Sequence, residues 1–80
     1  MGNSELKNQI RRLRFNNGEI TQQQLANLVG VTRQTILAIE AGNYSPSLTL
    51  AFKIANAFKV PLETVFQYEG KSPETSAENK

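Results

Sequence analysis

The sequence predicts a compact all-α domain, and three observations carry this prediction. The chain has 80 residues, which is enough for one small core and too few for a second folded unit. Apolar residues recur at spacings of three and four along residues 3–66, as they do on one face of a helix. No stretch alternates apolar and polar residues for long enough to indicate a strand. We therefore expect five short helices within residues 1–67, followed by a disordered polar tail over residues 68–80.

Periodicity and capping residues predict the first two helices. A first helix is expected over residues 4–16, because three apolar residues share one face there: Leu6, Ile10 and Leu13. Thr21 and Gln24 have the spacing of a capping box, so a second helix should begin directly after Thr21. Gly30 can adopt the left-handed backbone that ends this helix after about two turns.

The last three helices are predicted in the same way. Thr32 caps a third helix over residues 33–41, and Ser47 caps a fourth. Pro61 suits the first position of a short fifth helix that closes the core. The fourth helix should turn one apolar face inward: Leu50, Ala51, Ile54, Ala55 and Phe58. We also expect most of the aromatic side chains to lie in the core.

Composition argues against an enzyme. The chain has no Cys, His or Asp, and its seven Glu residues are scattered along the sequence. Thiolate and imidazole metal ligands and the usual general base are therefore missing, so we expect no catalytic residue, metal or cofactor, and no small-molecule ligand is evident. No apolar run has the length of a membrane span, and the N-terminal residues do not resemble a signal peptide. We expect a cytoplasmic protein that does not bind membranes.

The charge is only mildly basic, with a formal net charge of +2 at pH 7. Four bases lie close together near the N-terminus: Lys7, Arg11, Arg12 and Arg14. Such a cluster is typical either of a phosphate-binding surface or of the solvated face of a helix, and the sequence leaves both interpretations open.

The third helix has an outward face whose composition suits DNA. At about 100° per residue, Ile36 and Ile39 fall on one side, while the opposite side holds four residues: Arg33, Gln34, Leu37 and Ala38. A guanidinium, an amide and apolar groups match the donors, acceptors and thymine methyls of the major groove. Many surface helices carry Arg and Gln, so this face alone is a weak indication.

The short connection around Gly30 strengthens the indication. Two helices joined by a tight, glycine-containing turn form the helix-turn-helix, which places its second helix in the major groove. The first turns of both helices also present free backbone N–H groups that suit phosphate oxygens.

At these residues the sequence resembles the Cro/CI-type, or xenobiotic-response-element, family of helix-turn-helix regulators. The resemblance covers about residues 10–66 and is specific in its combined spacing. It rests on Thr21-Gln22-Gln23-Gln24-Leu25-Ala26, Gly30-Val31-Thr32-Arg33-Gln34-Thr35-Ile36, Ile39-Glu40-Ala41-Gly42 and Pro46-Ser47-Leu48. The short chain is most similar to the small stand-alone repressors of the cytolysin-regulator kind. The resemblance implies a five-helix, lambda-repressor-like fold that binds double-stranded DNA as a homodimer.

The resemblance also implies roles for matching positions. The expected DNA contacts are Gln22, Thr32, Arg33, Gln34, Thr35, Leu37, Ala38, Asn43, Tyr44 and Ser45. Arg14 and Glu40 would form a structural ion pair, which removes Arg14 from any DNA-binding patch. Val60, Leu62 and Phe66 would pack against a second copy, and Phe52 belongs either to the core or to that interface.

Two departures from the family pattern concern the loop after the first helix and the outward face of the third helix. Residues 16–19 make the loop about one residue longer than usual, and Leu37 and Ala38 replace residues that are often polar. The second departure leaves the base sequence read at those positions open.

The predicted function is a dimeric transcription regulator, most simply a repressor that occupies a palindromic operator. An antitoxin or a restriction-modification controller would bind DNA in the same way. A protein-interaction module that has lost DNA binding is a third possibility, against which Arg33 and Gln34 argue.

Overall fold

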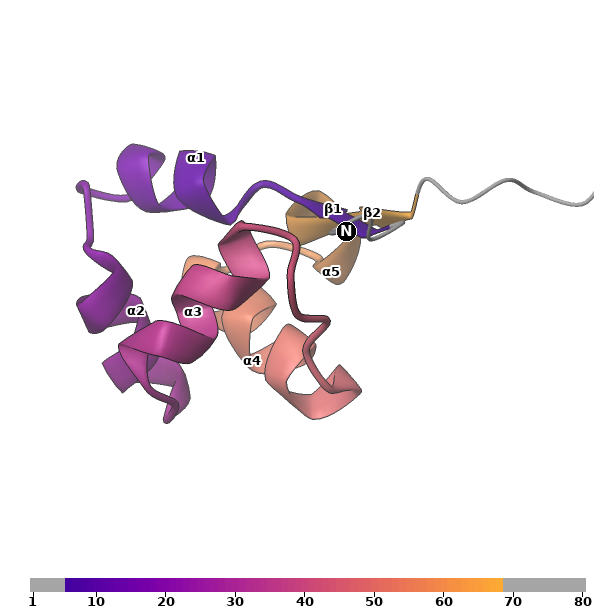
Figure 1. Ribbon diagram of the computed structural model, residues 1–80. Helices are drawn as coiled ribbons and strands as arrows, with labels where there is room; N and C mark the ends of the chain where they lie inside the picture. Colours follow the sequence, from indigo (N-terminus) through magenta and orange to yellow (C-terminus); the bar gives the residue numbers. More distant parts are fainter. Residues whose placement is uncertain (1–5, 69–80) are drawn as a thin grey trace, which may run out of the picture.

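A computed structural model of the chain describes residues 6–68, and its architecture is mostly helical (Figure 1). Within this range five helices and two short strands follow one another: β1 (Leu6–Asn8), α1 (Ile10–Asn16), α2 (Gln22–Val29), α3 (Arg33–Glu40), α4 (Leu48–Phe58), α5 (Leu62–Val65) and β2 (Phe66–Tyr68). The predicted five-helix fold is thereby confirmed. No helix in the described part of the chain is long and apolar enough to cross a membrane.

All five helices contribute to one core. Its fully buried large side chains are Ile10, Leu25, Ile36, Ile39, Ile54 and Val65. The predicted inward face of α4 is confirmed, since all five of its expected core residues are buried. A period of three and four therefore predicted correctly which side of α3 and α4 is removed from water.

Side-chain caps begin three of the helices, as expected. Thr21 and Gln24 form a complete capping box at the start of α2, with the Thr21 side chain accepting from the Gln24 N–H. Thr32 accepts from the N–H of Thr35, and Ser47 accepts from that of Leu50. Each cap satisfies an N–H group that the helix cannot, which stabilises a helix by about 1 kcal/mol. Local sequence thus sets where the helix-turn-helix begins.

The N-terminal segment differs from the prediction. Residues 6–8 are extended, and α1 begins only at Ile10, whereas a helix was expected from residue 4. The Asn8 side-chain oxygen accepts the Ile10 N–H at 3.1 Å, and the Gln9 N–H donates to the Val65 carbonyl at 2.8 Å. These bonds hold the segment outside the helix. The prediction of a helix there was wrong, because partners distant in sequence satisfy its backbone.

The two strands, which were not expected, pair in an antiparallel sheet. Leu6 lies opposite Tyr68, and Asn8 lies opposite Phe66. Strands of three residues are too short to show an alternating pattern, and this pairing joins the two ends of the described chain (Figure 1). Tyr68 is part of β2, although the tail was expected to begin there. The rest of the predicted tail lies outside the described residues.

Two further expectations are corrected. Pro61 has an extended backbone with ψ of 157° and precedes α5 as its N-cap, so Leu62 and not Pro61 is the first helical residue. Most aromatic side chains are also not in the core. Only Phe58 and Phe66 are buried, whereas Phe15, Tyr44, Phe52 and Tyr68 are 50–66% exposed. An aromatic residue in so short a chain often has no second layer of structure to cover it.

Candidate nucleic-acid interface

The turn between α2 and α3 consists of three residues, Gly30 to Thr32. Gly30 has φ of 78° and ψ of 32°, the left-handed conformation that glycine adopts without strain. The N–H groups of Gly30 and Val31 both donate to the Ala26 carbonyl, at 2.8 and 3.0 Å. Thr32 then returns to an extended backbone and caps α3. The glycine predicted to end α2 therefore sets the geometry of the turn, and α2 packs directly against α3 (Figure 1).

The inner and outer faces of α3 lie as the periodicity predicted. Ile36 and Ile39 are 0% and 2% exposed and anchor the helix in the core. Arg33, Gln34 and Leu37 are exposed, and Leu37 retains 47% of its accessible surface. Of the other expected contact residues in this segment, Thr32 is exposed, and Thr35 and Ala38 are half-buried.

Arg33 and Gln34 have polar side chains that are not used inside the protein. Within residues 6–68 neither side chain forms a hydrogen bond or an ion pair. The Thr35 hydroxyl, in contrast, lies 3.1 Å from that of Thr32 and shares a hydrogen bond with it. The outer face of α3 therefore offers a guanidinium and an amide whose donors and acceptors are available to a ligand.

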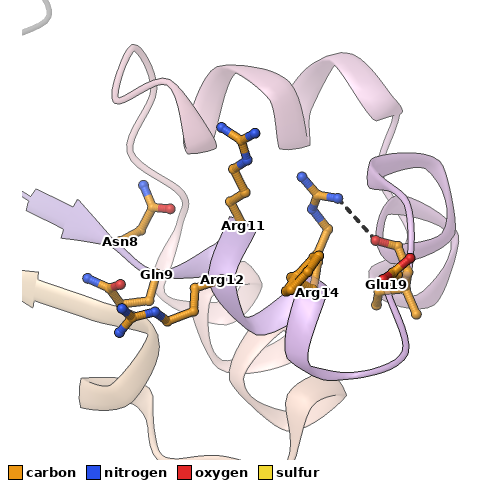
Figure 2. A pocket seen from close by; sticks show the side chains of 8 residues that line it. Asn8, Gln9, Arg11, Arg12, Arg14 and Glu19 are labelled. Atoms are coloured by element: carbon orange, nitrogen blue, oxygen red, sulfur yellow. Dashed lines mark hydrogen bonds between the residues drawn. The ribbon is translucent and has the colours of Figure 1, made fainter.

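A partly buried ion pair joins α1 to the end of α3, as expected. Arg14 donates from Nε to Glu40 Oε2 at 2.7 Å and from Nη2 to Oε1 at 3.1 Å, with the two side chains only 16% and 11% exposed. Arg14 Nη1 also donates to the Ile20 carbonyl at 3.0 Å, the bond drawn in Figure 2. Each of the three guanidinium nitrogens thus donates a hydrogen bond, two of them to α3 and one to the loop before α2.

Gln22 belongs to the same network. Its side-chain Nε2 donates to Glu40 Oε1 at 3.1 Å. Gln22 was expected to contact DNA, and its side-chain amide is bonded within the protein. The backbone N–H of Gln22, at the first position of α2, has no partner inside the helix.

The loop after α3 keeps three expected contact residues at the surface. Gly42 has φ of 82°, and the N–H groups of Gly42 and Asn43 close the helix end by donating to Ile39 and Ala38 at 3.0 and 2.9 Å. Asn43, Tyr44 and Ser45 follow directly and are exposed. These two hydrogen bonds place the start of the loop against the last turn of α3.

One residue that organises this end of the domain, Asn8, was not predicted from the sequence. The Asn8 side-chain Nδ2 donates to the Ile39 carbonyl at 3.0 Å, and its oxygen accepts from Ile10. Asn8 therefore connects the start of α1 to the last turn of α3. An Asn just before an apolar run is a common helix start signal, which would have indicated Asn8 had α1 been placed correctly.

The residues expected at a dimer interface differ in exposure. Val60 and Leu62 are half-buried and pack against the core, whereas Phe66 is buried at 8% exposure. More exposed apolar side chains lie nearby in the sequence on α4, where Leu48 and Phe52 are 68% and 52% exposed. These two side chains are four residues apart and share one side of the helix.

Comparisons with known proteins agree with this geometry. Residues 10–65 match the helix-turn-helix family. The transcriptional regulator YgzD of Bacillus subtilis is 50% identical over 64 residues, which cover 80% of this chain and 96% of YgzD. An HTH-type transcriptional regulator of Methanocaldococcus jannaschii is 60% identical over 50 residues, 62% of this chain and 76% of that protein.

One solved structure and one named repressor extend the comparison. The restriction-modification controller protein C.AhdI from Aeromonas hydrophila superposes with a TM-score of 0.63 at 31% identity, covering 69% of this chain and 78% of that one. The cryptic phage CTXphi transcriptional repressor RstR of Vibrio cholerae is 40% identical over 53 residues, 66% of this chain and 47% of RstR. The turn, the caps and the matches together show that this chain belongs to the Cro/CI-type family of helix-turn-helix transcriptional regulators.

Proposed function

We propose that the protein is a sequence-specific regulator that reads double-stranded DNA with α3 in the major groove. One observation carries this proposal. Arg33 and Gln34 are exposed and form no bond within residues 6–68, while Ile36 and Ile39 fix the opposite face of the same helix in the core. Arg pairs with guanine and Gln with adenine through two hydrogen bonds each, and Leu37 can contact a thymine methyl.

Phosphate contacts would position this helix. The first turns of α2 and α3 present backbone N–H groups, so Gln22 would contact a phosphate through its main chain while its side chain stays on Glu40. Thr32 and Thr35 would lie at the groove edge. On the other side of α3, the exposed loop residues Asn43, Tyr44 and Ser45 would follow the adjoining backbone.

A homodimer on a palindromic operator gives such a small domain enough specificity. One eight-residue helix reaches only a few base pairs, and each bidentate contact discriminates by about 1–3 kcal/mol. A second copy doubles the contacts by symmetry. We place Val60 and Leu62 at the dimer interface together with Phe52 of α4, whose exposure favours an interface over the core. Phe66 would support this interface from within the monomer core.

The biological role would be repression in the cytoplasm, where a bound dimer occludes a promoter. The similarity to RstR, a named transcriptional repressor, supports this role. A controller of restriction and modification is the second candidate, and the likeness to C.AhdI favours it. Both roles require the same DNA-binding surface.

A gel-shift assay at low salt with mixed genomic DNA tests DNA binding itself. Retention that decreases with rising salt is expected, because phosphate contacts release counterions. A protein-interaction module that has lost DNA binding would give no retention even at the lowest salt. The genes next to the coding sequence would then separate a repressor from a controller.

A further inference from the structure

The basic cluster of α1 contains two arginines that form no bond within the described residues, Arg11 and Arg12. Arg11, Arg12 and Arg14 line an open depression beside α1, together with a single acid, Glu19 (Figure 2). Arg14 is held by Glu40 and by the Ile20 carbonyl. Arg11 and Arg12 are exposed, and neither forms a hydrogen bond or an ion pair within residues 6–68.

The two unpaired arginines extend to different sides. Arg11 and Arg14 are three residues apart on α1 and so share one side of this helix, and Asn8, at the end of β1, lines the same depression. Asn8 donates to the Ile39 carbonyl, and Arg14 pairs with Glu40. Asn8 and Arg14, which lie three residues before and after Arg11, therefore both contact the last turn of α3. In Figure 2 Arg11 and Arg14 extend toward α3, whereas Arg12 extends away from them on the side of Gln9.

Glu40, the acid that pairs with Arg14, does not neutralise Arg11. Both carboxylate oxygens of Glu40 accept from Arg14, and Oε1 accepts from Gln22 as well. A carboxylate that already balances one guanidinium leaves the charge of a second one uncompensated. The exposed loop residues 43–45 begin three residues after the end of α3, and the Asn43 N–H bonds the Ala38 carbonyl of that helix.

We propose that Arg11 is a phosphate-binding residue that clamps the DNA backbone beside the C-terminal end of α3. This inference rests on the proposed DNA binding and adds to it a contact from α1, outside the helix-turn-helix. The ligand is a backbone phosphodiester, which a guanidinium can bind through two parallel hydrogen bonds. The contact carries no base information, so it raises affinity for all DNA sequences alike and fixes how deeply α3 enters the groove. Arg12 makes no such contact.

The test compares Arg11→Ala with Arg12→Ala, which remove the same charge from adjacent exposed positions. Binding to a short random-sequence DNA duplex is measured over a range of salt concentrations. Loss of one phosphate contact reduces the slope of log affinity against log salt by about 0.9, so the affinity deficit of Arg11→Ala should shrink about three- to fourfold between 50 and 200 mM salt. Arg12→Ala should keep the wild-type slope, and Arg11→Lys should recover most of it. Melting of each variant shows that the fold is retained.

The outcomes separate this inference from the proposed function. Equal slope changes for Arg11→Ala and Arg12→Ala, or a wild-type slope for Arg11→Ala, would overturn the role of Arg11 while wild-type binding persists. A reduced slope for Arg11→Ala that Arg11→Lys restores would support it. Absence of wild-type binding at the lowest salt would instead reject DNA binding as a whole.

Discussion

Arg14 and Glu40, 26 residues apart, are joined by two charge-assisted hydrogen bonds across the interface between α1 and α3. Gln22 adds a third bond to the same carboxylate. Since α1 lies outside the helix-turn-helix, this pair fixes the position of α1 relative to α3. The side chains are mostly buried, so each charge depends on the other for compensation.

We predict that Arg14→Ala and Glu40→Ala each lower the free energy of unfolding by about 1.5–3 kcal/mol. Each substitution leaves a mostly buried charge without its partner. The double variant should be more stable than the sum of the two losses indicates, with a coupling energy of about 0.5–3 kcal/mol. Denaturant unfolding of the four proteins measures this cycle. Arg12→Ala, an exposed neighbour, is the control and should stay within about 0.5 kcal/mol of wild type; strictly additive losses would reject the coupling.

A second prediction concerns the turn at Gly30. Gly30→Ala should destabilise the domain by about 1–2 kcal/mol, because a Cβ disfavours the left-handed backbone there. Apart from Gly30 and its two chain neighbours, no atom of the described residues lies within 4 Å of where that Cβ would be, so the loss comes from backbone conformation and not from a clash. Gly30→Asn should lose less, since Asn tolerates this region better. Thermal melting of both variants measures the difference, and equal stability of Gly30→Ala and wild type would contradict this explanation of the turn.

A third prediction concerns the apolar side of α4. Phe52→Ser should weaken the dimer at least about tenfold, because it removes an aromatic side chain from the proposed interface. Phe15→Ser is the matched control, since Phe15 is 66% exposed on α1 and Phe52 is 52% exposed on α4. Sedimentation equilibrium of the three proteins gives the dissociation constants. If Phe52→Ser associates as tightly as wild type, Phe52 is not at the interface.

A fourth prediction concerns the spacing of the operator. Two copies related by a twofold axis should place their recognition helices in successive major grooves, about 34–36 Å apart. Adding about half a helical turn of DNA between the half-sites moves one of them to the opposite side of the duplex, so tight binding should be lost. Adding a full turn keeps the half-sites on one side and is the control for length. Unchanged affinity with the half-turn insertion, in a complex of one protein per DNA, would show that a monomer is the binding unit.

Local signals in the sequence predicted the helix-turn-helix, the part of the fold that forms the candidate nucleic-acid interface. Thr21, Thr32 and Ser47 cap the helices they were expected to cap, and Gly30 adopts the expected left-handed turn. Each of these features depends on residues at most four positions apart. The Arg14–Glu40 pair was implied by the resemblance to the family and is also confirmed.

Contacts between distant residues were not predictable from local pattern. The pairing of Leu6 with Tyr68 joins the two ends of the described chain, and the bond from Asn8 to the Ile39 carbonyl spans 31 positions. The apolar residue Leu6 fitted a helix period as well as it fits a strand. The exposure of Phe15 and Phe52 depends on which surfaces lack a covering layer, which the period of a single helix does not determine.

The central claim is that the outward face of α3 reads DNA. Arg33→Ala and Gln34→Ala measure it most directly, by comparing affinity for the best DNA sequence selected from a random pool with melting temperature. Each variant should lose about 1–3 kcal/mol of binding free energy and relax the base preference at one position of each half-site, while its melting temperature stays close to that of wild type. Unchanged affinity and base preference together with a strongly lowered melting temperature would contradict the account, because these side chains would then serve the fold and not the DNA.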